Sequence, residues 1–231
     1  MSSRRTLNSS EGKSSNPAKR FLQWKSNDKC FAYYDKEKGE NVQVSLPFKF
    51  QFLEHFSTVK GWNDATETGI YSNEIMFTSK EELTVKTFKG LEIAKGLYKD
   101  IRSKVRDAGG KYHRSVYVLD ENANIVNIQM KGAVVSAYSV FMDGDAKAGI
   151  KGNKHLIENN WIVVNKFQDL KKGATKYSVP IFEIGADFTK DEFELANEKY
   201  KEIESYFDAY KGNTYVNDIE VQEEEDDNLD F

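Results

Sequence analysis

The sequence is nearly without cysteine, since Cys30 is the single one among 231 residues. A lone cysteine excludes an intramolecular disulfide and a zinc site built from several thiolates. No run of about 18 apolar residues occurs, so the sequence predicts no membrane-spanning helix. Residues 1–20 lack the apolar segment of a secretory signal. We therefore expect a cytoplasmic protein with no membrane association.

Patterns that mark catalytic centres are also lacking. His55, His113 and His155 stand alone, without the spacing of a metal-binding pair. Residues 144–151 superficially resemble a phosphate-binding loop, but an isoleucine separates the last glycine from its lysine and no Ser or Thr follows. No GxSxG sequence is present, and the cysteine has no nucleophile signature around it. We expect a binding protein that is not an enzyme and that holds neither a metal nor a cofactor.

Charge is divided unevenly along the chain, whose formal net charge is −4. Residues 218–231 contain eight acidic residues and no Lys or Arg, whereas residues 1–20 contain five basic residues and one acidic residue. The remaining residues, 21–217, balance at 28 basic and 28 acidic side chains. A surface for nucleic acid must therefore come from local clustering of basic residues and not from the overall charge.

The composition predicts three segments. Residues 1–20 are rich in Ser, Asn and Lys and have almost no apolar side chains, so we expect a disordered basic N-terminal tail. Residues 21–212 contain the apolar and aromatic residues needed for one folded domain. Residues 213–231 are expected to form a disordered acidic C-terminal tail.

Strands are predicted from local patterns of apolar and aromatic residues. The clearest alternation covers Asn41–Phe52 and is interrupted by Pro47, which suggests an edge or a bulge. A polar loop that carries Trp62 is expected between Phe56 and Gly69. The other predicted strands lie within residues 21–34, 70–77, 83–88, 112–119, 125–131, 161–167 and 176–184.

Helices are predicted at Leu91–Ala108 and Ala133–Met142, with a loop rich in Gly and Lys at Asp143–Lys154. A final amphipathic helix begins at the capping box Thr189–Glu192 and ends at Gly212. Its apolar stripe is expected to pack on the domain, and a helical homodimer seam is the alternative. Strands without regular βαβ alternation favour a mainly β, α+β fold, namely an antiparallel β-barrel like the oligonucleotide-binding (OB) fold with inserted and C-terminal helices.

Aromatic and basic residues lie close together along several predicted strands. Proteins that bind single strands stack bases on aromatic rings and hold phosphates with Lys or Arg. Phe48, Phe50 and Phe52 are expected in the core because they share one strand face. The candidate DNA-binding residues are Trp24, Lys25, Lys49, Trp62, Tyr112, Arg114, Lys131, Lys147, Lys151, Lys154 and Lys166.

The acidic C-terminal run ends in two apolar residues, Leu229 and Phe231. A partner can bury a terminal ring in an apolar pocket and hold its carboxylate with basic side chains. This tail, about ten residues of 231, resembles that of single-stranded DNA-binding proteins of bacteria and tailed phages. The resemblance carries over Asp226, Asp227, Asp230 and Phe231 as partner-binding residues. Bacterial tails have Pro before the final Phe, where this chain has Asp230, and a long Gly- or Gln-rich linker is absent.

The resemblance implies binding of single-stranded DNA without sequence specificity during replication, recombination and repair. It also implies that the tail recruits replication proteins such as a DNA polymerase, helicase or primase. Two alternatives stay open at this point. One is a metal-dependent nuclease or recombination subunit, and the other is a phage structural or assembly protein.

Overall fold

The computed structural model describes residues 16–212. Residues 1–15 and 213–231 lie outside this part, and with them Asp226, Asp227, Asp230, Phe231 and most of both predicted tails. The fold is mainly β with three helices, and thus of the α+β class. The elements are β1 (Arg20–Lys25), β2 (Cys30–Asp35), β3 (Glu40–Val44), β4 (Phe48–Asn63), β5 (Thr68–Ser72), β6 (Leu83–Thr87), β7 (Glu92–Gly96), α1 (Tyr98–Asp107), β8 (Gly110–Asp120), β9 (Ile125–Lys131), α2 (Ala133–Asp143), β10 (Gly144–Asp145), β11 (Ile150–Lys151), β12 (Asn160–Lys172), β13 (Thr175–Asp187) and α3 (Lys190–Gly212).

One large sheet runs in the order β3-β2-β1-β9-β8-β4-β5-β6-β7, and β12 pairs with both β4 and β13. Its neighbouring strands are antiparallel except β1 and β9, which are parallel. The path has free ends at β3 and β7 within the described residues, so the sheet does not close into the expected antiparallel barrel. β4 is 16 residues long and carries a bulge between Phe52 and Glu54, where the sheet can bend.

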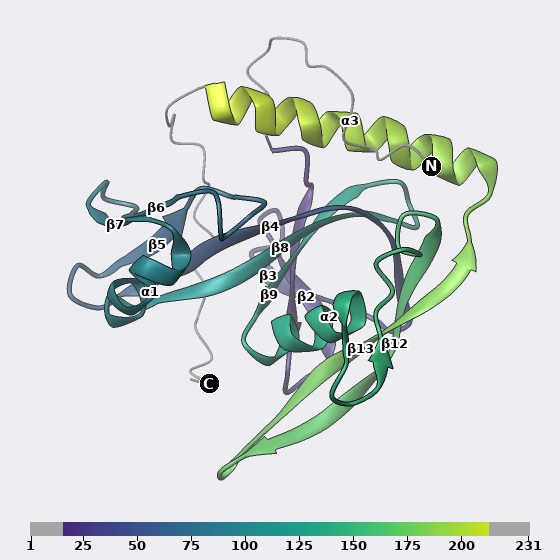
Figure 1. The fold of residues 1–231 in the computed structure, drawn as a ribbon, viewed down its shortest axis with the longest axis horizontal. Helices are drawn as coiled ribbons and strands as arrows, with labels where there is room; N and C mark the ends of the chain where they lie inside the picture. Colours follow the sequence, from purple (N-terminus) through teal and green to yellow (C-terminus); the bar gives the residue numbers. More distant parts are fainter. Residues whose placement is uncertain (1–15, 213–231) are drawn as a thin grey trace.

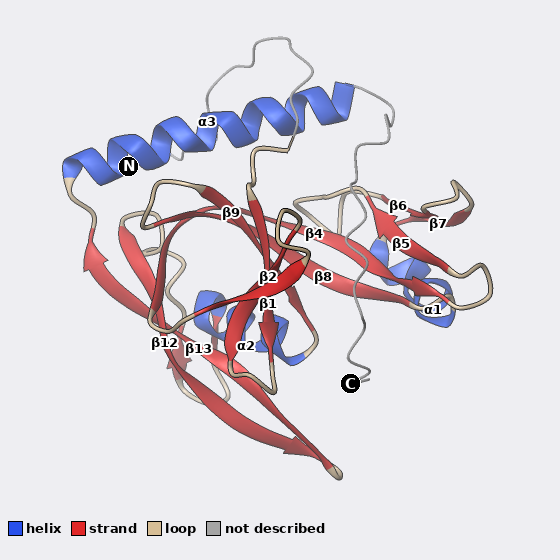
Figure 2. Ribbon diagram, turned by 180° about the vertical axis from the view of Figure 1, so that it is seen from behind, coloured by secondary structure: helices blue, strands red, loops and turns tan. Residues whose placement is uncertain are grey.

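The two faces of the sheet pack against different layers (Figures 1 and 2). Since side chains alternate along a strand, Val116 and Val118 of β8 enter a core with α2, β12 and β13. Phe48, Phe50 and Phe52 lie in this core, as the sequence predicted. The opposite face is covered at one end by α3, which crosses it in both ribbon views.

The C-terminal helix begins as predicted. The Thr189 backbone N–H donates to Glu192 Oε2 at 2.8 Å, and the Glu192 backbone N–H donates to Thr189 Oγ1 at 3.3 Å, which is the reciprocal capping box. The helix then buries Ala196, Ile203 and Phe207 against the sheet. No helix of the described residues is long and apolar enough to cross a membrane.

A small lobe is inserted between β4 and β8. It consists of β5, β6, β7 and α1, and its own core contains Ile70, Leu83, Val85, Ile101 and Val105. This lobe extends the sheet to one side of the molecule (Figure 1). The lobe therefore lies beside the end of the sheet that α3 does not cover (Figure 1).

Two sequence predictions in this lobe are wrong. The polar loop expected at Phe56–Gly69 is only the turn at residues 64–67, because β4 runs to Asn63 and β5 begins at Thr68. The helix expected from Leu91 begins only at Tyr98, because residues 92–96 form β7 and pair with β6. The apolar spacing that suggested a helix comes from strand residues and helix residues that share one core.

Pro47 separates two strands rather than bulging one. β3 pairs with β2, whereas β4 starts after the cis Leu46–Pro47 bond and pairs with β8 and β12. The first predicted strand region, residues 21–34, is likewise two strands joined by a turn. The predictions at residues 83–88, 112–119, 125–131, 133–142, 161–167 and 176–184 are confirmed as β6, β8, β9, α2, β12 and β13, and the 70–77 prediction only as the short β5.

Candidate nucleic-acid interface

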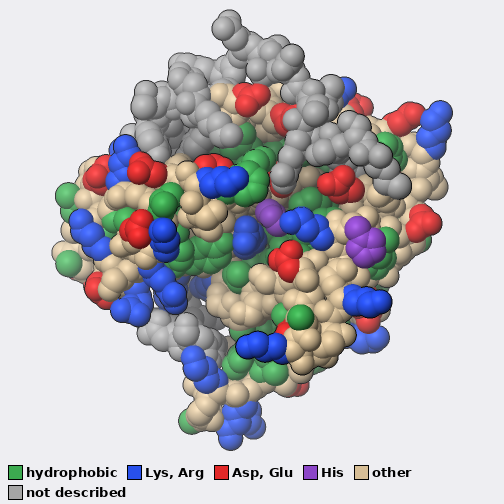
Figure 3. All heavy atoms as spheres, viewed as in Figure 1, with side chains coloured by type: hydrophobic (Ala, Val, Ile, Leu, Met, Phe, Trp, Pro, Cys, Tyr) green, Lys and Arg blue, Asp and Glu red, His purple; other side chains and the backbone are tan. Residues whose placement is uncertain are grey.

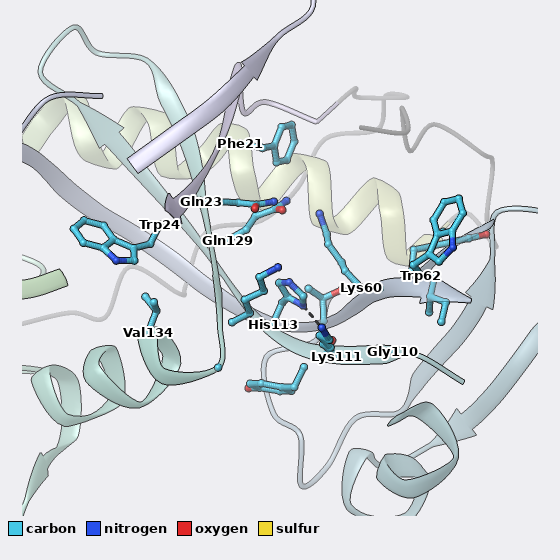
Figure 4. Close-up of a pocket in the computed structure, with 18 of the residues that line it drawn as sticks. Phe21, Gln23, Trp24, Lys60, Trp62, Gly110, Lys111, His113, Gln129 and Val134 are labelled. Atoms are coloured by element: carbon cyan, nitrogen blue, oxygen red, sulfur yellow. Dashed lines mark hydrogen bonds between the residues drawn. The ribbon is translucent and has the colours of Figure 1, made fainter. Parts of the chain in front are cut away.

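A groove with a volume of about 2200 Å³ opens where α3 leaves the sheet uncovered. Its floor comes from β4, β8 and β9, and its walls come from the inserted lobe on one side and from β1 and β2 on the other. Figure 4 shows Lys60 and His113 in the middle of this space, with Trp24 to one side and Trp62 to the other. These residues are up to 89 positions apart in sequence, between Trp24 and His113, and meet only through strand pairing.

Three lysines surround His113 on the floor. Lys60 of β4 lies opposite Lys111 of β8, and His113 lies between Thr58 of β4 and Lys131 of β9. Residues directly opposite in an antiparallel pair point to the same face, so these side chains form two adjacent cross-strand rows. The rows place three positive charges together in a chain whose overall charge is negative. Clustered lysines of this kind attract phosphates.

His113 is 4% exposed, and burial lowers its pKa from 6.5 to about 3, helped by Lys60, Lys131 and Lys111. A hydrogen bond of 3.1 Å joins its Nδ1 to the backbone carbonyl of Lys111, drawn as a dashed line in Figure 4. The ring is therefore neutral at pH 7 and adds no charge of its own.

Aromatic rings line the lobe side of the groove. Trp62 is 47% exposed and lies opposite Gly69 of β5, whose missing Cβ leaves the space that the Phe88 ring occupies. Phe88 stacks on Tyr71 with ring centroids 5.3 Å apart and planes inclined by 12°. Tyr71 in turn lies opposite Lys60. An exposed ring beside lysines, as at Trp62, is the arrangement in which single-strand binders stack bases.

Trp24 has a different role on the other wall. Its indole N–H donates to the backbone carbonyl of Ser178 at 3.0 Å, and its ring lies edge-on against Phe31 at 5.2 Å. These contacts tie β1 to β13 across the gap in the sheet. Trp24 therefore lines the groove but is held by the core, whereas Trp62 keeps an open face.

Basic side chains outnumber acidic ones among the described groove residues. One of the acids is Glu74, which accepts a hydrogen bond from the Tyr117 hydroxyl at 2.9 Å, and burial raises the pKa of its carboxyl. The basic residues are Lys19, Arg20, Lys25, Lys36, Lys60, Arg102, Arg106, Lys111 and Lys131, and the acidic residues are Asp28, Asp35, Glu37, Asp64, Glu74 and Asp107.

The structure brings some of the sequence-predicted residues together. Trp24, Lys25, Trp62, Tyr112 and Lys131 all line the groove. Tyr112 shares a 2.8 Å hydrogen bond with Ser57 Oγ, to which Arg114 Nη1 donates at 3.1 Å. Arg114 itself is not among the residues that line the groove.

The other predicted residues lie elsewhere. Lys49 is 2.9 Å from Glu121 Oε1 and also lies over the Trp161 ring, while Lys166 is 3.2 Å from Glu183 Oε1. The predicted Gly/Lys-rich loop contains the short β10–β11 hairpin. Its three lysines, Lys147, Lys151 and Lys154, do not line the groove.

Sequence reasoning missed Lys60, Lys111, Tyr71 and Phe88. Lys60 and Trp62 were assigned to a loop, so their shared strand face went unnoticed. The alternation of Thr58, Lys60 and Trp62 would have indicated a strand with a polar face.

No three His, Cys, Asp or Glu side chains come together as a metal site within residues 16–212. No family model matches the chain, and neither a curated protein nor a solved structure matches it. The site must therefore be interpreted from its own geometry.

Proposed function

We propose that the chain binds single-stranded DNA along this groove, without sequence specificity, as part of replication, recombination and repair. The observation that carries the proposal is the convergence of Lys60, Lys111 and Lys131 in a groove beside the open face of Trp62. Lysines neutralise phosphates whatever the base, and an aromatic face stacks on any base. This pairing favours an exposed, unpaired strand as the ligand.

The element order supports the same proposal. Strands β4, β8 and β9 form an antiparallel meander, α2 follows, and the hairpin β12–β13 returns so that β12 pairs antiparallel with β4. These elements form a unit of five strands with a helix before the last hairpin. We propose that this unit is an open variant of the OB fold. In this variant β1 lies parallel to β9, and hydrogen bonds of Trp24 and Ser26 with Ser178 join β13 to β1 and to the turn that follows β1.

The acidic C-terminal segment completes the proposal. We infer from the tail resemblance that Asp226, Asp227, Asp230 and Phe231 recruit replication proteins such as a polymerase, helicase or primase. Phe231→Ala keeps every side-chain charge of the tail but removes the ring. It is expected to abolish partner capture while DNA affinity stays within about twofold. Unchanged capture of the polymerase, helicase and primase would overturn this part of the proposal.

The direct test is a titration of the full chain with fluorescent oligo(dT) and with a blunt duplex of matched length. We expect tighter binding to oligo(dT), an affinity that falls as salt rises, and quenching of tryptophan emission through Trp62. Added magnesium is expected to leave the oligonucleotide intact. Equal or tighter binding to the blunt duplex, or cleavage that requires magnesium, would contradict the proposed function.

A further inference from the structure

The hairpin β12–β13 projects from the body as an arm, which we define as residues 166–181. Pairing of β12 with β4 covers only Ile162–Val164, and beyond it β12 and β13 pair with each other alone within the described chain. The arm strand 166–172 has seven residues, or about 23 Å at about 3.3 Å per residue. Figures 1 and 2 show the arm extending past every neighbouring element.

The arm is fixed to the body near its middle, at Ser178 and its strand partner Asp169. Ser178 is 2% exposed, its backbone N–H donates to Ser26 Oγ at 2.6 Å, and its carbonyl accepts from the Trp24 indole. On the other strand, Asp169 forms an ion pair of 3.0 Å with Lys29. An arm anchored this way presents its tip, residues 171–176, in a defined direction.

All charged residues of the tip are basic. Lys171, Lys172 and Lys176 are exposed, and residues 170–177 contain no acid. Figure 3 shows Lys and Arg side chains gathered at this lower end of the molecule. The three lysine side chains form no ion pair or hydrogen bond within residues 16–212, unlike Lys166 on the same hairpin, which pairs with Glu183.

The register places two of these charges against each other. Lys171 lies directly opposite Lys176, so both side chains leave the same face of the ribbon. Like charges directly opposite in an antiparallel pair are destabilising. An external anion that lies between them removes this repulsion, and a phosphate backbone supplies such anions at regular spacing.

The chemistry of the tip distinguishes it from the groove. Residues 171–176 include no aromatic side chain, so the tip cannot stack on an unpaired base. A two-stranded ribbon, with strands about 4.8 Å apart, instead fits the major groove of a duplex, which is about 12 Å wide. Tyr177, next to the tip, lines the single-strand groove, so a duplex on the arm adjoins a strand in the groove.

We propose that the tip of the arm binds the phosphate backbone of duplex DNA next to the single strand, which makes the protein a binder of single-strand–duplex junctions. The junction preference rests on the proposed function of the groove. The duplex contact itself does not, because different residues make it. The two ideas can therefore fail separately.

The test compares three fluorescent ligands, namely an oligo(dT), a blunt duplex, and the same duplex with that oligo(dT) as an overhang. The intact full chain is expected to bind the junction at least about tenfold more tightly than oligo(dT) in about 0.05 M salt. Changing Lys171, Lys172 and Lys176 together to Ala is expected to erase this gain and to leave oligo(dT) affinity within about twofold. The slope of log affinity against log salt on the junction should fall by about 2 to 3.

A matched control removes three exposed lysines that do not line the groove, Lys95, Lys190 and Lys201. This control should keep the junction gain, and Arg at the three tip positions should restore it. Equal loss in the control, an unchanged junction gain without the tip lysines, or a tip variant that weakens oligo(dT) as much as the junction would overturn the inference. The intact chain could also fail to bind oligo(dT) while its binding to the duplex still requires the tip lysines. This result would reject the proposed function of the groove and support the duplex contact of the arm.

Discussion

The two ends of one sheet face differ sharply, although the same strands build both. At one end Tyr117 and Leu119 of β8 are fully buried beneath α3, together with Phe56 and Phe207. At the other end Lys111 is half-buried, and His113 is buried among lysines at the floor of the groove. The covered end is mainly apolar, and the open end is charged and accessible.

This difference shows that coverage by α3, and not the strand itself, decides whether an aromatic residue of β4 is part of the core or exposed. Phe56 stacks on Phe207 of α3 with ring centroids 3.9 Å apart, which makes it part of a core. Trp62, six residues along the same strand and on the same face, keeps 47% of its surface exposed. The predictions below test whether the two ends act independently.

The largest effect is expected at the covered end. Phe207→Ala removes a ring that is 5% exposed and packs on Phe56 and Tyr117, so it should lower the free energy of unfolding by about 3–5 kcal/mol. Chemical denaturation measures this. Phe193→Ala, a change at an exposed ring of the same helix, is the control and should cost below about 1 kcal/mol. Similar losses for both would mean that α3 does not pack through its apolar stripe.

The next effect is expected at the open end. Changing Lys60, Lys111 and Lys131 together to Ala should weaken oligo(dT) binding by about two orders of magnitude in ~0.1 M salt and lower the salt slope by about 2 to 3. Thermal unfolding should confirm a folded chain. Equal weakening in the variant that lacks Lys95, Lys190 and Lys201 would show that only net charge matters.

A smaller effect is expected from the exposed ring. Trp62→Ala should weaken oligo(dT) binding by about 1–3 kcal/mol and remove most of the fluorescence quenching. Trp24→Phe keeps a ring in the core but loses the hydrogen bond to Ser178. It should lower stability by about 1 kcal/mol and leave the quenching in place. If the quenching disappeared in Trp24→Phe and not in Trp62→Ala, Trp24 would be the stacking residue and Trp62 would not.

The last effect concerns His113, and it is absent at pH 7 and appears only as the pH falls. Its pKa of about 3 in the folded chain lies below its ordinary value of 6.5, so the unfolded chain takes up a proton first as pH falls. The stability linked to neutral His113 is present above pH 6.5 and is lost between pH 6.5 and about 3, by at most about 1.4 kcal/mol per pH unit. Denaturation of His113→Gln over this range should show a correspondingly shallower decline. Parallel pH profiles would contradict a buried, neutral His113.

Local patterns in the sequence predicted much of the fold. Neighbouring residues determine the capping box at Thr189 and the hairpins β8–β9 and β12–β13, and all three are found in the structure. The open sheet could not be predicted this way, because closure depends on whether β13 pairs with a distant strand. The inserted lobe was also missed, since β7 and α1 share one core and their combined spacing imitates a single helix.

The candidate site was only partly predictable for the same reason. Trp62 and Tyr112 were selected from their local neighbours, and both line the groove. The partnership of Lys60, Lys111 and Lys131 arises from strand register across a span of 71 residues, which local composition does not show. Lys147, Lys151 and Lys154 looked equally suitable in sequence, yet they belong to a different surface.

Lysine footprinting tests the central claim most directly. The full chain is acetylated with and without saturating oligo(dT), and the modified lysines are identified by mass spectrometry. The account predicts that oligo(dT) protects Lys60, Lys111 and Lys131 and leaves the lysines of the β10–β11 loop as reactive as before. Protection of Lys147, Lys151 and Lys154 with no change at the groove lysines would contradict it.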